Sequence, residues 1–167
     1  MRYINLATLL FVLYFVSGTL GLNFNPVSGF ATLVWVPSGL SQAFLLIFGL
    51  RFWPAITLGA FCTNLASDAS IATAAGISVG NTLEPLAGAY LLKHVIKIRP
   101  SLDRIHDIVG LIFFGAILST LISATLGTST LQLNSIISTT EYGSTWFAWW
   151  IGDAISVLIV TPLILVW

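Results

Sequence analysis

The feature that most constrains this chain is a series of six mostly apolar stretches that together occupy nearly its whole length. A helix needs about 20 such residues to cross the roughly 30 Å of hydrocarbon in a bilayer. The connections between the stretches are short and leave no room for a soluble domain. We therefore predict an all-α, polytopic transmembrane helical bundle of about six spans, with residues 1–167 forming one integral membrane domain. The predicted spans are approximately residues 4–22, 31–50, 54–66, 71–92, 108–126 and 146–167.

The scarcity of charge supports this fold class and excludes others. Only 7% of the residues are charged, against about 25% in a usual soluble domain, and the mean hydropathy is +0.98. So few charges cannot cover the surface of a soluble enzyme domain, and nucleic-acid binding needs a basic surface that this composition lacks. We expect the lipid bilayer as a partner and no nucleic acid. Asp103, His106 and Asp107 stand together, but one His-Asp pair is weak evidence for a metal, so we expect no metal site and no cofactor.

The basic residues predict the orientation of the spans. Six spans place every Lys and Arg on one side, whereas the opposite connections, residues 23–30, 67–70 and 127–145, contain none. The positive-inside rule then predicts that both termini are cytoplasmic. The first stretch runs on past Val16 without a small-residue cleavage site, so we expect a retained span and not a signal peptide. The basic residues are Arg2, Arg51, Lys93, Lys97, Arg99 and Arg104.

The second stretch is interrupted by a proline. Pro37 would suit the first turn of a helix that runs to Leu50. Such a helix is about 20 Å long, too short to cross a bilayer, so its N-terminus would lie within the membrane. Free N–H groups after Pro37 would form an electropositive spot that suits an anion, as in the broken helices of transporters. A proline kink without any ligand is the alternative interpretation.

The fourth stretch carries a carboxylate, Glu84, among small residues at four-residue spacing. Gly76 and Gly80 share its helical face, so we expect Glu84 to point into a helix contact and not into lipid. Pro85 cannot donate to the carbonyl of Asn81, which is left free. A carboxylate and a free carbonyl one turn apart suit a cation, a proton or a hydrogen-bonding ligand. The alternative is a protonated Glu84 that only ties helices together.

The sixth stretch carries Asp153, with Trp149 one turn before it. An aromatic wall over a carboxylate suits a cationic or aromatic ligand, whereas interfacial anchoring is the alternative and the favoured interpretation for Trp146. Counted along the predicted spans, Glu84 lies about 20 Å and Asp153 about 11 Å below the outer ends. We therefore expect the two carboxyls to border one cavity without sharing a proton directly. The candidate ligand-binding residues are Trp35, Pro37, Ser38, Asn81, Glu84, Trp149 and Asp153, and none is expected to be catalytic.

Several motifs in order resemble the first type of bacterial membrane-associated sensor domain, of the MASE family. The resemblance covers about residues 5–167 and implies a non-catalytic sensory input domain in the bacterial inner membrane. Such domains occur at the N-terminus of sensor histidine kinases and diguanylate cyclases. For this chain the resemblance implies that a ligand or a membrane signal is detected. It also implies a cytoplasmic output module after residue 167 and a homodimer formed through that module. The family usually has more spans than the six visible here. The motifs are Trp35-Val36-Pro37-Ser38-Gly39-Leu40, Arg51-Phe52-Trp53-Pro54, Gly80-Asn81-Thr82-Leu83-Glu84-Pro85 and Trp149-Trp150-Ile151-Gly152-Asp153.

Two other functions fit the same pattern of spans. A small transporter, or the substrate-capture membrane subunit of an importer, also needs six spans in a chain of this length. A purely structural anchor is the third, but an anchor has no need of polar residues buried in its spans. A fused signalling module would favour the sensor, and a co-purifying ATPase would favour the transporter.

Overall fold

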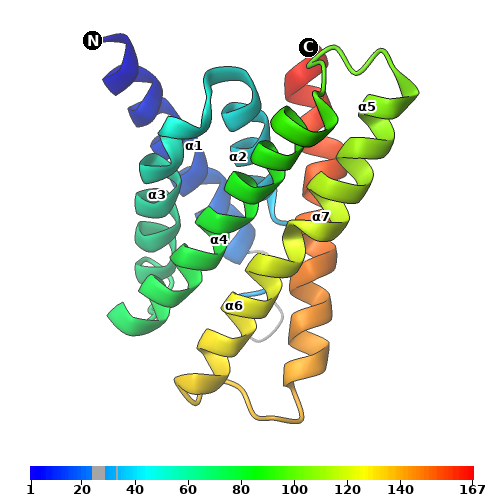
Figure 1. The fold of residues 1–167 in the computed structure, drawn as a ribbon. Helices are drawn as coiled ribbons and strands as arrows, with labels where there is room; N and C mark the ends of the chain where they lie inside the picture. The colour runs from blue at the N-terminus through cyan, green and yellow to red at the C-terminus, as the bar shows by residue number, and fades with distance from the viewer. Residues whose placement is uncertain (24–28, 33) are drawn as a thin grey trace.

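The computed structural model describes residues 1–23, 29–32 and 34–167, and in them the chain forms helices and no β-strand (Figure 1). This confirms the all-α helical bundle. The helices are α1 (Arg2–Asn23), α2 (Val36–Phe48), the 3₁₀ turn η1 (Leu50–Phe52), α3 (Trp53–Leu65), α4 (Ile71–Leu91), the π-helical η2 (Leu92–Ile96), α5 (Ile105–Gly110), the π-helical η3 (Leu111–Leu118), α6 (Thr120–Leu133) and α7 (Tyr142–Val166).

Three of the described helices are long and apolar enough to cross a membrane: α1, the continuous helix Ile105–Leu133, and α7. The short helix α2 is also apolar. Helix α4 has 21 residues but is less apolar, and it packs against α2, α3 and α6. Its neighbours thus bury many of its polar side chains. The count of six spans stays a prediction, as does the interpretation of the segment around Pro37 as a broken span.

Both termini lie at one end of the bundle, together with the α2–α3 turn and the α4–α5 connection (Figure 1). The six Lys and Arg residues belong to these segments or to the turns that lead into them. The α3–α4 turn and the α6–α7 connection lie at the opposite end and contain neither residue type. The fold therefore sorts the basic residues to one end, as the positive-inside argument requires.

The core consists of two apolar clusters with polar residues between them. Along α4, Ile77 belongs to one cluster and Ala89 to the other, and Glu84 lies between them. On α7, Asp153 takes the corresponding place. A group of buried polar side chains thus lies between the two clusters on α4 and α7. We call this group the polar centre: Tyr14, Ser38, Asn81, Glu84, Ser123, Trp149 and Asp153, all less than 6% exposed.

The face of α4 that carries small residues packs against α6, which confirms the expected helix contact. A Cβ atom added to Gly76 would lie 2.5 Å from the Thr130 side chain. One added to Gly80 would lie 3.1 Å from Cβ of Leu126 and 3.4 Å from the carbonyl oxygen of Ser123. The two glycines therefore let the backbones of α4 and α6 approach closely.

Two helices extend further than the sequence predicted. The helix expected to end near Leu126 continues to Leu133, and α7 begins at Tyr142 and not at Trp146. The intervening Ser and Thr residues look polar in the sequence. Two of their hydroxyls find partners that suit a continued helix. Thr130 donates to the carbonyl of Leu126 one turn back at 2.7 Å, and the Ser129 hydroxyl pairs with that of Tyr142 at 3.0 Å.

Candidate functional site

Helix α2 begins against the middle of α7, and backbone groups make the contact. The N–H of Trp35 donates to the carbonyl of Gly152 at 3.1 Å. The N–H of Gly39 donates to Oγ of Ser156 at 3.0 Å, and Oγ1 of Thr161 donates to the carbonyl of Gly39 at 2.9 Å. A Cβ atom at Gly39 would lie only 2.3 Å from the carbonyl oxygen of Ser156, so the approach depends on glycine.

The free N–H groups expected at the start of α2 are not there. Pro37 does lie in the first turn, as predicted. However, the N–H of Ser38 donates to the carbonyl of Trp35 at 3.0 Å, and the N–H of Gly39 is used by Ser156. The expectation was wrong because α7 supplies a partner that is distant in the sequence. This helix end therefore gives no support for an anion.

Glu84 and Asp153 lie beside each other at the middle of the polar centre, and both are 0% exposed. Oγ of Ser38 donates to Oδ1 of Asp153 at 2.9 Å. Three carboxyl oxygens have no hydrogen-bond partner among the described residues: both oxygens of Glu84, and Oδ2 of Asp153.

This contact corrects the expectation that the two carboxyls lie at different depths. Because α7 begins at Tyr142, Asp153 lies about 17 Å along its helix, against about 20 Å for Glu84 along α4. The earlier difference came from the wrong start of the sixth span. The two carboxyls thus lie at similar distances along their helices and interact with each other.

A chain of hydrogen bonds runs past the carboxyl pair and joins four helices. Nε1 of Trp149 on α7 donates to Oγ of Ser123 on α6 at 3.0 Å. Ser123 donates to Oδ1 of Asn81 on α4 at 2.9 Å, and Nδ2 of Asn81 donates to the hydroxyl of Tyr14 on α1 at 3.0 Å. Ser123 and Asn81 each accept one bond and donate the next, so the chain has one direction from α7 to α1.

Trp35 closes the polar centre on the side of α1. Its ring meets that of Tyr14 edge-on, with centroids 6.5 Å apart, and it packs over Gly18 and Gly21 of α1. Its indole N–H is buried and has no hydrogen-bond partner within residues 1–23, 29–32 and 34–167. The structure therefore brings the predicted site residues into one connected region, with Pro37 at its edge in the first turn of α2.

Two members of the polar centre were missed by the sequence reasoning. Tyr14 is a single tyrosine in the middle of an apolar span, and a buried tyrosine hydroxyl needs a partner. This was an available signal. Ser123 gave no comparable signal, because serine is common on helix-packing faces.

Two other buried polar residues do not join the polar centre. Asn64 bonds to the carbonyl of Ala60 in its own helix at 2.8 Å. The Gln42 amide lies against Gly88 of α4 and Gly115 of η3, and neither of its polar atoms has a partner among the described residues. Gln42 marks the contact between α2 and the π-helical segment.

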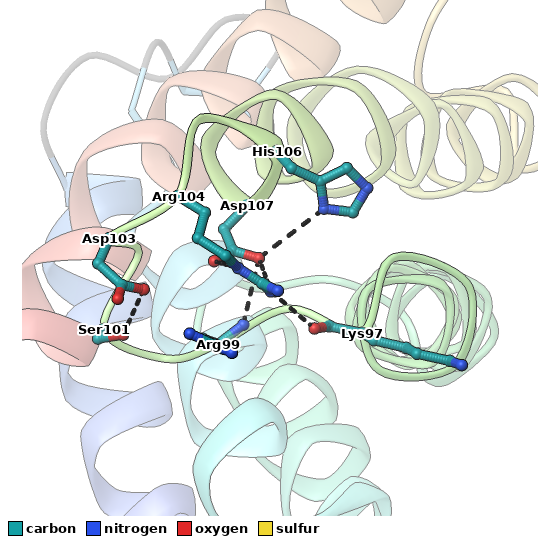
Figure 2. Close-up of polar contacts among 7 residues, drawn as sticks. All are labelled: Lys97, Arg99, Ser101, Asp103, Arg104, His106 and Asp107. Atoms are coloured by element: carbon teal, nitrogen blue, oxygen red, sulfur yellow. Dashed lines mark hydrogen bonds and ion pairs between the residues drawn. The ribbon is translucent and has the colours of Figure 1, made fainter.

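The charged connection between η2 and α5 is a closed structural unit (Figure 2). Arg104 donates hydrogen bonds from two of its nitrogens to the Asp107 carboxylate, with Nε at 2.8 Å from Oδ2. This contact raises the pKa of the Arg104 guanidinium. Arg104 also donates to the carbonyl of Lys97 at 3.0 Å, and the N–H of Arg99 donates to Asp107 at 3.3 Å. These bonds fix the connection against the start of α5.

In the same unit Asp103, His106 and Asp107 do not converge on one point. Figure 2 shows Asp103 bonded to Ser101 at 2.9 Å, away from Asp107, while Nδ1 of His106 lies 4.0 Å from Asp107. Across the described residues, no group of three or more His, Cys, Asp or Glu side chains is placed to hold a metal ion.

Comparison with known protein families gives a match over residues 6–167, to the family MASE1. This chain belongs to the MASE1 family. MASE1 domains are membrane-associated sensor domains, which confirms the resemblance seen in the motifs. The match and the apolar helices make this MASE1 domain a membrane protein with a sensory input role. Neither the comparison with curated proteins nor that with solved structures gives a match.

In this MASE1 domain the polar centre contacts five helices: α1, α2, α4, α6 and α7. A change in charge or hydrogen bonding at the carboxyl pair therefore acts on most of the bundle at once. It acts most directly on the contact between α2 and α7, through the bond from Ser38 to Asp153.

Proposed function

We propose that this MASE1 domain is the sensory input of a bacterial signalling protein of the inner membrane, and that the polar centre receives the signal. One observation carries the proposal: three carboxyl oxygens of Glu84 and Asp153 are buried and have no hydrogen-bond partner in the part of the chain that the structure describes. Burying such groups unpaired is costly, and ionisable residues inside a membrane domain are functional candidates by default. The signal is a bound ligand or a change in the state of the membrane.

Helix α7 is the element that carries the response. It holds Asp153 in its middle and runs on to Val166, towards the proposed cytoplasmic output module after residue 167. A change at the carboxyl pair shifts α7 against α2, because two neighbouring residues of α2 are bonded to α7. Ser38 bonds to Asp153, and Gly39 bonds to Ser156. Both termini are proposed to face the cytoplasm, and the output module is proposed to form the homodimer.

The sequence also fits a small transporter or the capture subunit of an importer. That alternative is less well supported, because the family is one of sensor domains. The two functions differ in what a change at the polar centre alters: signalling output in one case, and movement of a solute in the other.

The test is the output of the complete signalling protein, normalised to the amount of folded membrane protein. Asp153→Asn removes the charge but keeps an acceptor for Ser38, so we expect a folded protein with altered output, and the same for Glu84→Gln. The matched control is Asp68→Asn, an exposed turn residue with φ of 62°, a conformation that Asn adopts readily.

The control variant should signal normally. Normal output per folded molecule from both Asp153→Asn and Glu84→Gln would overturn the proposal. A loss confined to expression or stability would show that the carboxyls only hold helices together.

A further inference from the structure

We infer that Glu84 and Asp153, with the hydroxyl of Ser38, form a binding site for one monovalent cation, either a proton or an alkali-metal ion. The inference deepens the proposed function by naming the class of ligand, and it rests on that function for its consequence in signalling. Binding itself is independent of any output module.

The first support is the set of oxygen atoms that the fold gathers in one place. The two carboxyl groups lie side by side between α4 and α7, and Ser38 reaches Asp153 from α2. Both oxygens of Glu84 and one of Asp153 have no partner among the described residues, although neither residue is exposed. Hard cations prefer oxygen ligands of this kind.

The second support is the lack of a basic partner. The groups that interact with the pair from the packed helices are Tyr14 on α1, Ser38 on α2, Ser123 on α6 and Trp149 on α7. Tyr14 is the one titratable group among these four, and none is basic. Two carboxylates in contact, buried and without a counter-charge, repel strongly.

The basic residues nearest in sequence are occupied elsewhere. Lys93 donates to the carbonyl of Leu45 at 2.8 Å, and Arg104 is bound to Asp107. No basic group is among those that interact with the pair, so we assign the positive charge to an ion from solution. One bound monovalent cation reduces the negative charge of the pair from two units to one. The hydroxyls of Ser38 and Ser123 interact with the carboxyls that carry the remaining negative charge.

The size of the site argues against a divalent ion. Calcium takes about six to eight oxygen ligands, and magnesium keeps several of its waters. The pair and Ser38 supply fewer oxygens, and neighbouring apolar clusters enclose the polar centre on both sides. A proton needs only the two carboxyls, as in carboxyl pairs that share one proton.

Loss of the cation has a mechanical consequence. The two carboxylates, one on α4 and one on α7, then repel each other, and the repulsion favours a shift of α7 away from α4. Helix α2 follows α7, because Ser38 and Gly39 are bonded to it. Occupancy of the site thus sets the position of α7, the helix that leads to residue 167.

The test is thermal unfolding of the complete chain in detergent, in a buffer whose only cation is a bulky quaternary ammonium. A proton that the folded pair holds and that unfolding releases stabilises the fold at low pH. This stabilisation is lost as the pH rises. We expect the melting temperature of the unmodified chain to fall by at least about 2–4 °C between roughly pH 5 and pH 9. Glu84→Gln should alter the size or the midpoint of this pH dependence, because Asp153 is then a single buried carboxyl. The control Glu141→Gln, which changes an exposed carboxyl, should leave the dependence as it is.

A second arm distinguishes the two cations. At about pH 9, the quaternary ammonium is replaced by sodium or potassium at constant ionic strength. If sodium or potassium raises the melting temperature of the unmodified chain but not that of Glu84→Gln, the site binds the alkali ion. If the unmodified chain responds to pH but not to sodium or potassium, the site binds a proton. If Glu84→Gln does not fold, Asp153→Asn replaces it, because Asn still accepts the bond from Ser38.

The inference is overturned if the unmodified chain responds to neither pH nor alkali ion, or if Glu84→Gln responds as the unmodified chain does. These outcomes do not depend on signalling. A normal cation response together with unaltered output from the variants would overturn the proposed function and leave the site standing.

Discussion

The contact between α2 and α7 can be tested by a single added methyl group, in Gly39→Ala. The new Cβ would lie 2.3 Å from the carbonyl oxygen of Ser156 and 2.8 Å from Cβ of Val160. Neither a backbone carbonyl nor the stem of a β-branched residue can rotate away. Ordinary contact begins at 3.4 Å, so α2 and α7 must separate by about 1 Å.

The cost of this separation has two parts. Overpacking of a well-packed contact costs about 1–3 kcal/mol. The shift also weakens the bonds that join Gly39 to Ser156 and Thr161, at 3.0 and 2.9 Å, each contributing about 1 kcal/mol. Alanine offsets about 1 kcal/mol through its better helix propensity. We expect the free energy of unfolding to fall by about 2–4 kcal/mol.

The assay is reversible unfolding in detergent, followed by tryptophan fluorescence. The matched control is Gly143→Ala on α7, where an added Cβ meets no atom within 4 Å. This change should leave the stability unaltered or raise it by up to about 1 kcal/mol. If Gly39→Ala is as stable as Gly143→Ala, the close approach of α2 to α7 is wrong.

Three further predictions follow from the same packing and topology. Gly80→Leu should lower the free energy of unfolding by at least about 1–3 kcal/mol, because α6 lies against this glycine; an unchanged melting temperature in detergent would mean that Gly80 faces lipid. Ser123→Ala leaves two buried partners unpaired and should cost about 1–3 kcal/mol in unfolding measurements, whereas a neutral effect would refute the hydrogen-bond chain. Reporter fusions after Ser70 and Leu133 should read periplasmic and a fusion after Arg99 cytoplasmic; a cytoplasmic signal at Leu133 would contradict six spans.

Most of the candidate site was visible in the sequence because a bilayer makes polar residues conspicuous. Glu84 and Asp153 stand out in apolar spans, where an ionisable side chain is expensive. Tyr14 and Ser123 did not stand out in the same way. A hydroxyl in an apolar helix usually bonds to its own backbone, as Ser17 does in α1 at 2.7 Å, so the sequence does not show which hydroxyls reach another helix.

The errors in the prediction have two physical causes: contact between distant segments, and helices that extend into polar stretches. The N–H of Gly39 is used because Ser156 approaches it from α7. The depth of Asp153 was wrong because α7 starts at Tyr142, where the hydropathy is low. The π-helical segment η3 lies where Gln42 packs against it, and no local pattern encodes that contact.

The central claim is that the bond from Ser38 to Asp153 couples the polar centre to the position of α2 against α7. The most direct measurement is a double-variant cycle on the signalling output of the complete protein, per folded molecule, with Ser38→Ala, Asp153→Ala and both together. Residues that act through one contact show effects that do not add, so the account predicts that the double variant signals like Asp153→Ala alone. The pair Ser38→Ala and Glu141→Gln serves as the control and should be additive. Independent, additive effects of Ser38→Ala and Asp153→Ala would contradict the account.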